Sequence, residues 1–171
     1  FVVKTENLNV QVLGTKFNVA SYSDDDKVEV ALLEGSVALY SKNDNQEQFL
    51  SDLTPGKLAS YYPADRRFKI NETDTRRHIA WRDGKLCFYE TPMREVAREM
   101  ERWYNCQIVI DNEKLANMHL TATFEGENLE QALKLMSLAA PTSYSITPSK
   151  KLSDGTFSKQ KVTIKNRSIT K

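Results

Sequence analysis

Two segments in the second half of the sequence, 36 residues apart, carry the same pattern of apolar residues. Phe88 aligns with Phe124 at this spacing, and no gap is needed to keep the two segments in phase. A repeat that stays in phase through a strand, a helix and a second strand predicts two copies of one βαβ unit. The other matched pairs are Met93 with Leu129, Val96 with Ala132, Ala97 with Leu133, Met100 with Met136, and Ile110 with Ile146.

The first copy predicts one helix between two short strands. The strand LCFYE is followed by Thr91, which suits a helix N-cap, and by Pro92, which suits the first helical position. Asn105 is expected to end the helix in the left-handed conformation, before the strand QIVID. We therefore interpret MERWYNCQIVID (100–111) as a structural helix-to-strand junction rather than an active site. The helix has one apolar stripe, made by Met93, Val96, Ala97, Met100, Trp103 and Tyr104.

The second copy repeats this order. After the strand HLTATFE, Asn128 is expected to cap a helix, with Gln131 completing a capping box and Pro141 marking the stop. Two more strands, TSYSIT and KVTIKN, are expected on either side of the loop SKKLSDGTFSK. KVTIKN is a candidate free edge for pairing with a partner strand. The stripe of this helix is Leu129, Ala132, Leu133 and Met136.

Residues 1 to 72 show no helical period and predict β-structure throughout. VQVLGTKFNVASY alternates with period two around Gly14, and FKIN is expected to be a last strand. KVEVALLEGSVALYS is interpreted as a hairpin that turns at Glu34-Gly35. QFLSDLTPGKLASYY is interpreted as a second strand pair, joined by a type II turn at 54–57. Many short strands of this kind predict a sandwich-like or barrel-like unit.

The change of period predicts two domains. We expect an all-β domain at 1–72, a polar linker at 73–80 and an α+β domain at 81–171. The opening residues FVVKT look like the middle of a strand, with neither an initiator Met nor a signal peptide, so we expect an N-terminally truncated β-domain from a longer protein. The apolar stretches fall far short of the roughly 20 residues that span a bilayer. A membrane anchor is expected upstream.

The charge balance argues against nucleic acid as the main partner. The chain has 24 basic and 23 acidic residues, whereas phosphate binding needs a basic excess on some face. Arg94, Arg98 and Arg102 recur every four residues, but Glu95, Glu99 and Glu101 alternate with them, so a solvated helix face is favoured over a basic patch. In the RNA-binding folds of similar order, the third strand carries aromatic and basic residues, whereas LTATFEG has one aromatic and no basic residue.

No catalytic, cofactor or metal residue is assigned. Cys87, Cys106, His78 and His119 are scattered, without the short spacings of a zinc site. We expect the two cysteines to be buried thiols, with a single disulfide as the alternative. A thiol hydrolase that pairs either cysteine with His119 is a further hypothesis.

Two other sequence features resemble binding sites only in part. Asp24-Asp25-Asp26 lacks the ligand spacing of a calcium loop, so a solvated hairpin tip is favoured. Gly14-Thr15 is not part of a phosphate-binding loop, because neither glycine-rich phosphate motif is present.

The ordered motifs resemble a known family. FVVKT, VQVLGTKFNVASY, VEVALLEGSVAL and LTPGKLASYY together resemble the FecR family of periplasmic regulators. WRDGKLCFYETPMREVAREMERWYNCQIVID is similar to the C-terminal domain that accompanies FecR in Bacteroidetes-type proteins. That domain is similar in turn to the short N-terminal domain of secretins and TonB-dependent receptors, which is also a doubled βαβ unit.

The resemblance implies a signalling role without catalysis. It implies the periplasmic part of a single-pass inner-membrane anti-sigma factor. The expected partners are the signalling domain of a TonB-dependent outer-membrane receptor and, through a cytoplasmic part outside this chain, an extracytoplasmic-function sigma factor. The partner-binding residues are unknown at this stage. The alternative is a β-domain that senses a small ligand such as a glycan directly, with Tyr22, Tyr40, Tyr61 and Tyr62 as stacking surfaces.

Overall fold

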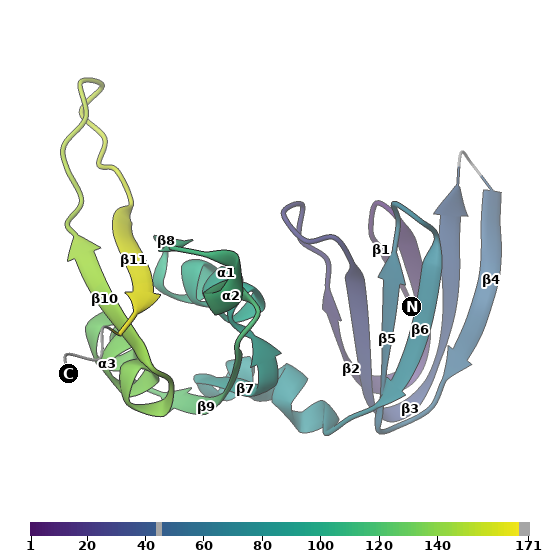
Figure 1. The fold of residues 1–171 in the computed structure, drawn as a ribbon. Coiled ribbons are helices and arrows are strands. Elements are labelled where there is room, and N and C mark those ends of the chain that lie inside the picture. The colour runs from purple at the N-terminus through teal and green to yellow at the C-terminus, as the bar shows by residue number, and fades with distance from the viewer. Residues whose placement is uncertain (44–45, 168–171) are drawn as a thin grey trace. The chain divides into compact units, whose positions relative to one another are not determined.

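The structure, a computed structural model, describes residues 1–43 and 46–167. The chain divides into two compact units, Phe1–Asp83 and Gly84–Lys171. Strands predominate in the first unit, and strands and helices alternate in the second (Figure 1). This arrangement is compatible with the predicted all-β and α+β parts.

The first unit is built on one antiparallel sheet. Its described strands follow the order β1-β2-β3-β5-β6, and β4 also pairs with β3. Their bounds are β1 (Val2–Lys4), β2 (Leu8–Ala20), β3 (Val28–Asn43), β4 (Gln46–Leu53), β5 (Lys57–Tyr62) and β6 (Arg67–Glu72). FKIN lies in β6, as predicted.

The predicted hairpin at Glu34-Gly35 is wrong. The strand β3 runs without interruption through Gly35, and the strand β2 runs through Gly14 beside it. The register between β2 and β3 shifts on both sides of Lys16. An irregularity of this kind bends the strands instead of reversing them. The chain reverses between β2 and β3 at residues 21–27, which place Asp24-Asp25-Asp26 in the connecting loop.

The predicted pairing of the strands around residues 54–57 is also wrong. Gly56 has the positive φ (83°) that the turn prediction required, and its N–H donates to the Leu32 carbonyl. The two flanking strands nevertheless pair with β3, β4 with its residues 37–43 and β5 with its residues 28–32. The bend at Gly35 explains this arrangement, because each half of β3 has its own antiparallel partner.

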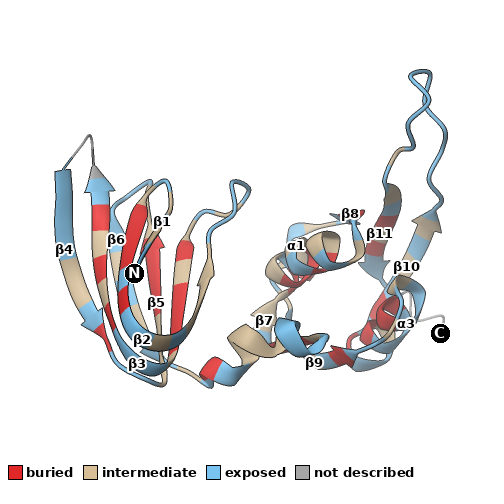
Figure 2. Ribbon diagram, turned by 180° about the vertical axis from the view of Figure 1, so that it is seen from behind, coloured by how far each residue is buried: buried red, intermediate tan, exposed pale blue. Residues whose placement is uncertain are grey.

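The core of the first unit lies on one face of this bent sheet. Leu32, Val37 and Leu39 of β3 are fully buried, on both sides of the bend. Each such side chain contributes about 1.5–3 kcal/mol relative to an exposed one. The strands β2, β4 and β5 complete the cluster with Leu8, Val10, Val12, Leu53, Ala59 and Tyr61. Figure 2 shows buried stretches, in red, mixed with half-buried and exposed ones along the strands of this sheet.

The segment predicted as a linker, 73–80, contains most of a 3-10 helix, η1 (Thr75–Asp83). This helix contacts β2 and β3 of the first unit. Trp81 on η1 donates its indole N–H to Asn18 Oδ1 on β2 at 3.1 Å. The polar run is therefore folded onto the first unit over most of its length.

The second unit has two small sheets. In the first, β7 (Lys85–Pro92) pairs antiparallel with β9 (His119–Glu125). In the second, the order is β10-β11-β8, with β11 antiparallel to β10 and parallel to β8. The remaining bounds are α1 (Met93–Tyr104), β8 (Cys106–Ile110), α2 (Glu113–Ala116), α3 (Leu129–Ala139), β10 (Thr142–Thr147) and β11 (Gln160–Asn166).

One hydrophobic core joins both sheets to the helices of this unit. Phe88 of β7 meets Phe124 of β9 edge to face, with ring centroids 6.0 Å apart. The helix α1 buries Met93, Val96, Ala97 and Met100, and α3 buries Ala132, Leu133 and Met136, as the two predicted stripes require. The strand β11 adds Val162 and Ile164, which are fully buried.

The helix ends agree with the sequence at two positions and differ at a third. Asn105 has φ 49° and ψ 47°, the predicted left-handed C-cap, and Asn128 forms the predicted capping box with Gln131. The predicted N-cap at Thr91 is wrong, because Thr91 and Pro92 both belong to β7 and pair with β9. Pro92 occupies the N-cap position, and the first helical N–H, that of Met93, donates to the Met118 carbonyl. A backbone partner from the neighbouring segment thus replaces a side-chain cap.

Candidate interaction site

The junction at residues 100–111 is structural. Asn105 turns the chain and donates its N–H to the Glu101 carbonyl. Glu101 Oε1 then accepts the Ile108 N–H at 2.6 Å, which ties the end of α1 to β8. Tyr104 packs against the core and donates its hydroxyl to the Glu127 carbonyl at 3.2 Å. These bonds hold the end of α1 against β8 and Glu127.

Trp103 does not close the apolar stripe as predicted. Its side chain is 39% exposed, whereas Tyr104 next to it is half-buried. Tyr104 takes the inward position on the last turn of the helix, four residues after the buried Met100. Trp103 is therefore left on the rim of α1.

The geometry does not assemble a thiol nucleophile. Cys106 is buried as predicted, and burial, together with the nearby Glu101 carboxylate, raises the pKa of its thiol. Cys87 is only half-buried and pairs with Thr123 across the β7–β9 ladder, whereas His119 pairs with Pro92. Four residues separate these two positions along β9, about 13 Å. Both cysteines are free thiols, so the disulfide alternative is not realised.

No metal site is found within residues 1–43 and 46–167, where His, Cys, Asp and Glu do not gather in groups of three or more that could hold an ion. Asp24 and Asp26 are exposed in the β2–β3 loop. The Asp25 N–H donates to the Tyr22 carbonyl at 3.2 Å, which closes a turn in this loop. The aspartate run thus lies at a hairpin tip, as the favoured interpretation predicted.

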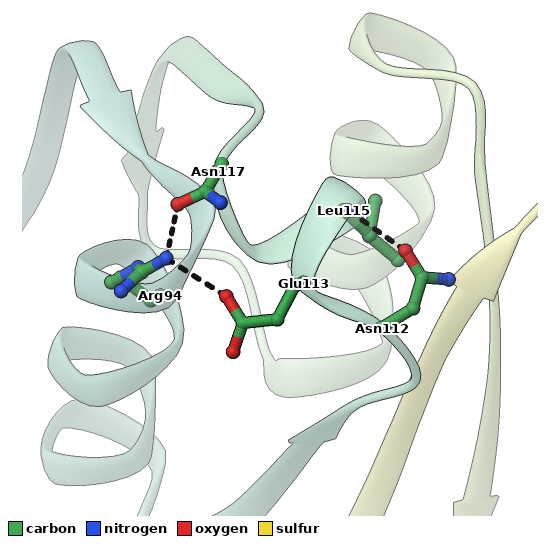
Figure 3. Close-up of polar contacts among 5 residues, drawn as sticks. All are labelled: Arg94, Asn112, Glu113, Leu115 and Asn117. Carbon is green, nitrogen blue, oxygen red and sulfur yellow. Dashed lines mark hydrogen bonds and ion pairs between the residues drawn. The ribbon is translucent and has the colours of Figure 1, made fainter.

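The arginines of α1 form a structural contact rather than an open basic patch. Arg94 reaches from α1 to α2, where it lies 3.2 Å from a Glu113 carboxylate oxygen and also bonds the Asn117 side chain (Figure 3). Asn112 caps α2 by accepting the Leu115 N–H, so this short helix is held at both ends. Arg98 and Arg102 also have partners and are half-buried.

The four candidate tyrosines do not gather into a stacking surface. Tyr61 is buried in the core of the first unit. Tyr40 packs edge to face on Phe49, with ring centroids 5.5 Å apart. The Arg67 guanidinium lies 4.2 Å from the ring centroid of Tyr62, near the end of β3 opposite to Tyr40. Tyr22 is exposed in the β2–β3 loop. The geometry therefore gives no specific support to a glycan site.

The prediction that KVTIKN is a free edge is wrong. This segment is β11, which hydrogen-bonds to β10 on one side and to β8 on the other. The outer strands of the second unit, as far as the structure describes it, are β8 and β10 in one sheet and β7 and β9 in the other. Each has one paired neighbour, so each can present unpaired backbone groups to an added strand. Strand order decides which segment is an edge, and residue patterns do not encode it.

Sequence patterns also missed a group of exposed apolar side chains on the second unit. Tyr89 of β7 and Trp103 of α1 are two of them. The loop SKKLSDGTFSK carries two more, Leu152 and Phe157, with exposed fractions of 46% and 67%. A loop with lysines on both sides of two large apolar residues was a signal that the sequence did contain.

Two known protein families match parts of the chain, one in each compact unit. The FecR protein family matches residues 1–38, and the FecR C-terminal family matches residues 85–152. The two matches fall in the expected order, one on each compact unit. The chain belongs to the FecR family. FecR-family proteins are membrane-anchored anti-sigma regulators and are not typically enzymes, so a signal-relay regulatory role is supported for this FecR chain.

Solved structures share the fold of this FecR chain. Two crystal structures of a candidate anti-sigma factor from Parabacteroides distasonis ATCC 8503, at 1.65 and 2.50 Å resolution, match it with TM-scores of 0.76 and 0.74. They are 24% and 23% identical to it, and the matches cover 98% of this chain and 72% and 71% of theirs. Among curated proteins, no relative matches significantly. Within the described residues, no helix is long and apolar enough to cross a membrane.

Proposed function

We propose that this FecR chain is the periplasmic signal-relay region of a transmembrane anti-sigma regulator. It receives a signal from the N-terminal signalling domain of a TonB-dependent outer-membrane receptor and controls an extracytoplasmic-function sigma factor through a cytoplasmic part. The observation that carries this proposal is the ordered pair of FecR matches on two compact units.

The second unit is the part that we expect to contact the receptor. Its two small sheets have outer strands that can accept a further strand, and main-chain hydrogen bonds formed in this way give affinity without a deep pocket. The first unit would transmit the effect of receptor binding towards the membrane. Such a relay requires that the receptor domain bind one state of the regulator more tightly than the other.

Titration calorimetry tests the proposal directly. The chain is titrated with the signalling domain of the receptor encoded beside it, and we expect saturable one-to-one binding. A signalling domain from an unrelated receptor is the control and should bind at least ten times more weakly. Absence of binding at high micromolar concentration would contradict the proposal.

Edge variants extend the test to the mode of docking. Val109→Lys on β8 and Ser145→Lys on β10 each place a charge on an outer strand, which disfavours strand addition at that edge. If docking uses one of these edges, one variant weakens binding and the other does not. Equal affinity for both variants and the parent would rule out these two edges as the docking strands.

A further inference from the structure

The chain between β10 and β11 forms an extended hairpin, which we call the arm and define as residues 148–159. The arm continues beyond the ends of both strands, and its residues are exposed over nearly its whole length (Figures 1 and 2). Lys151 and Phe157 form a β-bridge, and the Ser158 N–H donates to the Lys150 carbonyl at 2.9 Å. The arm is therefore a short two-stranded ribbon.

The tip of the arm is closed by specific hydrogen bonds. The Leu152 N–H donates to the Thr156 carbonyl at 2.7 Å, and the Gly155 N–H donates back to the Leu152 carbonyl at 3.1 Å. Asp154 Oδ1 accepts both the N–H and the hydroxyl of Thr156, at 2.9 and 2.7 Å. These two hydrogen bonds lower the pKa of the Asp154 carboxyl. The tip thus has a defined turn with an ionised carboxylate built into it.

The arm exposes apolar side chains that the fold does not use. Leu152 and Phe157 are 46% and 67% exposed, and neither belongs to the core cluster of the second unit. Neighbouring positions along a strand point to opposite faces, so the pairing of Lys151 with Phe157 puts Leu152 and Phe157 on opposite faces of the ribbon. An isolated two-stranded ribbon gains little stability of its own. These exposed side chains are therefore better explained by binding than by folding.

The arm is also basic. Lys150, Lys151 and Lys159 lie on it, and the described part of the chain places no carboxylate within ion-pair distance of them. The one acidic residue of the arm, Asp154, is engaged by Thr156. A surface with excess positive charge attracts an acidic partner, which raises the rate of association.

We propose that the arm docks into an acidic protein surface with an apolar recess. The ribbon inserts into the recess, where Leu152 and Phe157 on its opposite faces contact opposite walls. The three lysines pair with carboxylates around the recess. This inference rests on the proposed function, because it identifies that surface with the receptor's signalling domain. A lipid surface fits the arm less well, because the tip residues Ser153, Asp154 and Gly155 are polar and carry a negative charge, whereas membrane-inserting elements present apolar residues there.

Point variants test the apolar contacts. The double variant Leu152→Ser/Phe157→Ser should weaken binding of the signalling domain at least tenfold in titration calorimetry. Leu138→Ser is the matched control, because Leu138 is 73% exposed on α3 of the same unit, and it should bind like the parent. If the double variant also binds like the parent, the inference is overturned.

Charge variants test the role of the lysines. Lys150→Glu/Lys151→Glu should slow association at least tenfold at low salt and flatten its salt dependence, as measured by surface plasmon resonance. Lys114→Glu/Lys134→Glu changes the net charge equally at exposed positions elsewhere on the unit and should have a clearly smaller effect. Equal effects of the two pairs would overturn the specific role of the arm.

Deletion of the arm gives an independent test. Thr147 and Lys161 are paired across β10 and β11, so the arm and the adjoining Gln160, the first residue of β11, can be replaced by Asn-Gly, a two-residue turn that suits a hairpin. Circular dichroism should show a folded chain, and binding should fall at least tenfold. If the parent binds and the shortened chain binds equally well, the inference fails while the proposed function stands. If the parent itself does not bind, the proposed function fails first.

Vesicle sedimentation separates a protein partner from a lipid surface. The parent chain is spun with vesicles that contain phosphatidylglycerol, and we expect it to stay in the supernatant. Sedimentation that is lost when the arm is shortened would assign the arm to the membrane and overturn the inference.

Discussion

Substitution of Gly35 by alanine should destabilise the first unit far more than the same change at Gly14. Gly35 has φ +91°, and an added Cβ would lie 2.5 Å from Thr15 Cγ2, 3.0 Å from the Gly14 carbonyl oxygen and 3.1 Å from Thr15 Cα. Gly14 has φ +61°, and an added Cβ there would meet nothing within 4 Å. The two glycines therefore share backbone strain and differ in steric room.

The magnitudes follow from this difference. A left-handed backbone costs a non-glycine residue about 1–2 kcal/mol of folding stability. Alanine also lowers the conformational entropy of the unfolded chain, which offsets this cost by about 0.4–1 kcal/mol. Gly14→Ala should thus cost about 0–1.6 kcal/mol. Overpacking adds about 1–3 kcal/mol at Gly35, because two of the three crowded atoms belong to the backbone and cannot rotate away. Gly35→Ala should therefore cost about 1–4.6 kcal/mol.

Urea unfolding measures both costs. Trp81 lies on η1 in the first unit and Trp103 lies in the second, and they are the chain's two tryptophans. In a Trp103→Phe background, tryptophan fluorescence therefore reports on the first unit. The midpoint and slope of the transition give the free energy of unfolding for each alanine variant. Equal losses at Gly35 and Gly14 would refute the steric reasoning.

A second substitution tests which atoms cause the loss. Thr15→Ser removes the Cγ2 atom, which is the nearest contact, and leaves the backbone contacts in place. In the Gly35→Ala background it should restore part of the lost stability, and in the parent it should not stabilise. No recovery would mean that the backbone contacts, or φ itself, account for the whole cost.

Three further outcomes are expected. Burial lowers the pKa of His78 below its usual 6.5, against the opposing effect of Glu29, so the unfolded chain takes up the proton first. The stability contributed by neutral His78 is complete above pH 6.5, and it is lost as the pH falls towards the lowered pKa of the folded state. Urea midpoints measured at pH 7.5 and 5.5 should show this loss in the parent and a smaller loss in His78→Gln. Cys106 should resist a thiol reagent at pH 8 until urea unfolds the chain, because burial raises the pKa of its thiol. A Cys87→Ser variant leaves Cys106 as the one thiol that reacts, and fast labelling of this variant in its folded state would contradict the prediction. Asn128→Ala should lower stability by about 1 kcal/mol in a thermal melt followed by circular dichroism, because it breaks the capping box at the start of α3; an unchanged melt would show that the cap contributes little.

Local features of the fold could be predicted from the sequence. The stripes of α1 and α3 follow a helical period, and Asn105 and Asn128 act on backbone groups within a few residues of themselves. The predictions that were wrong concern features that depend on contacts with segments far apart in the sequence. Thr91 would suit an N-cap, but β9 pairs with it and holds it in a strand. Glycine at position 35 suits either a turn or a bend, and the register of β2 against β3 selects the bend.

The candidate site was harder to predict from the sequence, because the exposure of a side chain depends on whether distant segments pack against it. Trp103 and Tyr104 are adjacent aromatics of similar character, yet only Tyr104 faces the core. In the sequence, Leu152 and Phe157 lie in a loop, and nothing there shows that they belong to a ribbon. The turn at Asp154 and the bridge from Lys151 to Phe157 form this ribbon, on which both side chains are exposed. Arg94 is exposed, as the regular spacing of the arginines suggested, and it also spans from α1 to α2, which the spacing does not encode.

The place of β11 explains why the repeat predicted the helices but not the edges. The 36-residue repeat relates β7, α1 and β8 to β9, α3 and β10, so β11 has no counterpart in it. The two repeated strands β7 and β9 pair with each other, whereas β8 and β10 do not touch as neighbours and are joined through β11. The added strand thus completes the sheet and fills its core with Val162 and Ile164. It follows that the strand outside the repeat is the interior strand of this sheet, and that the equivalent strands β8 and β10 are its two edges.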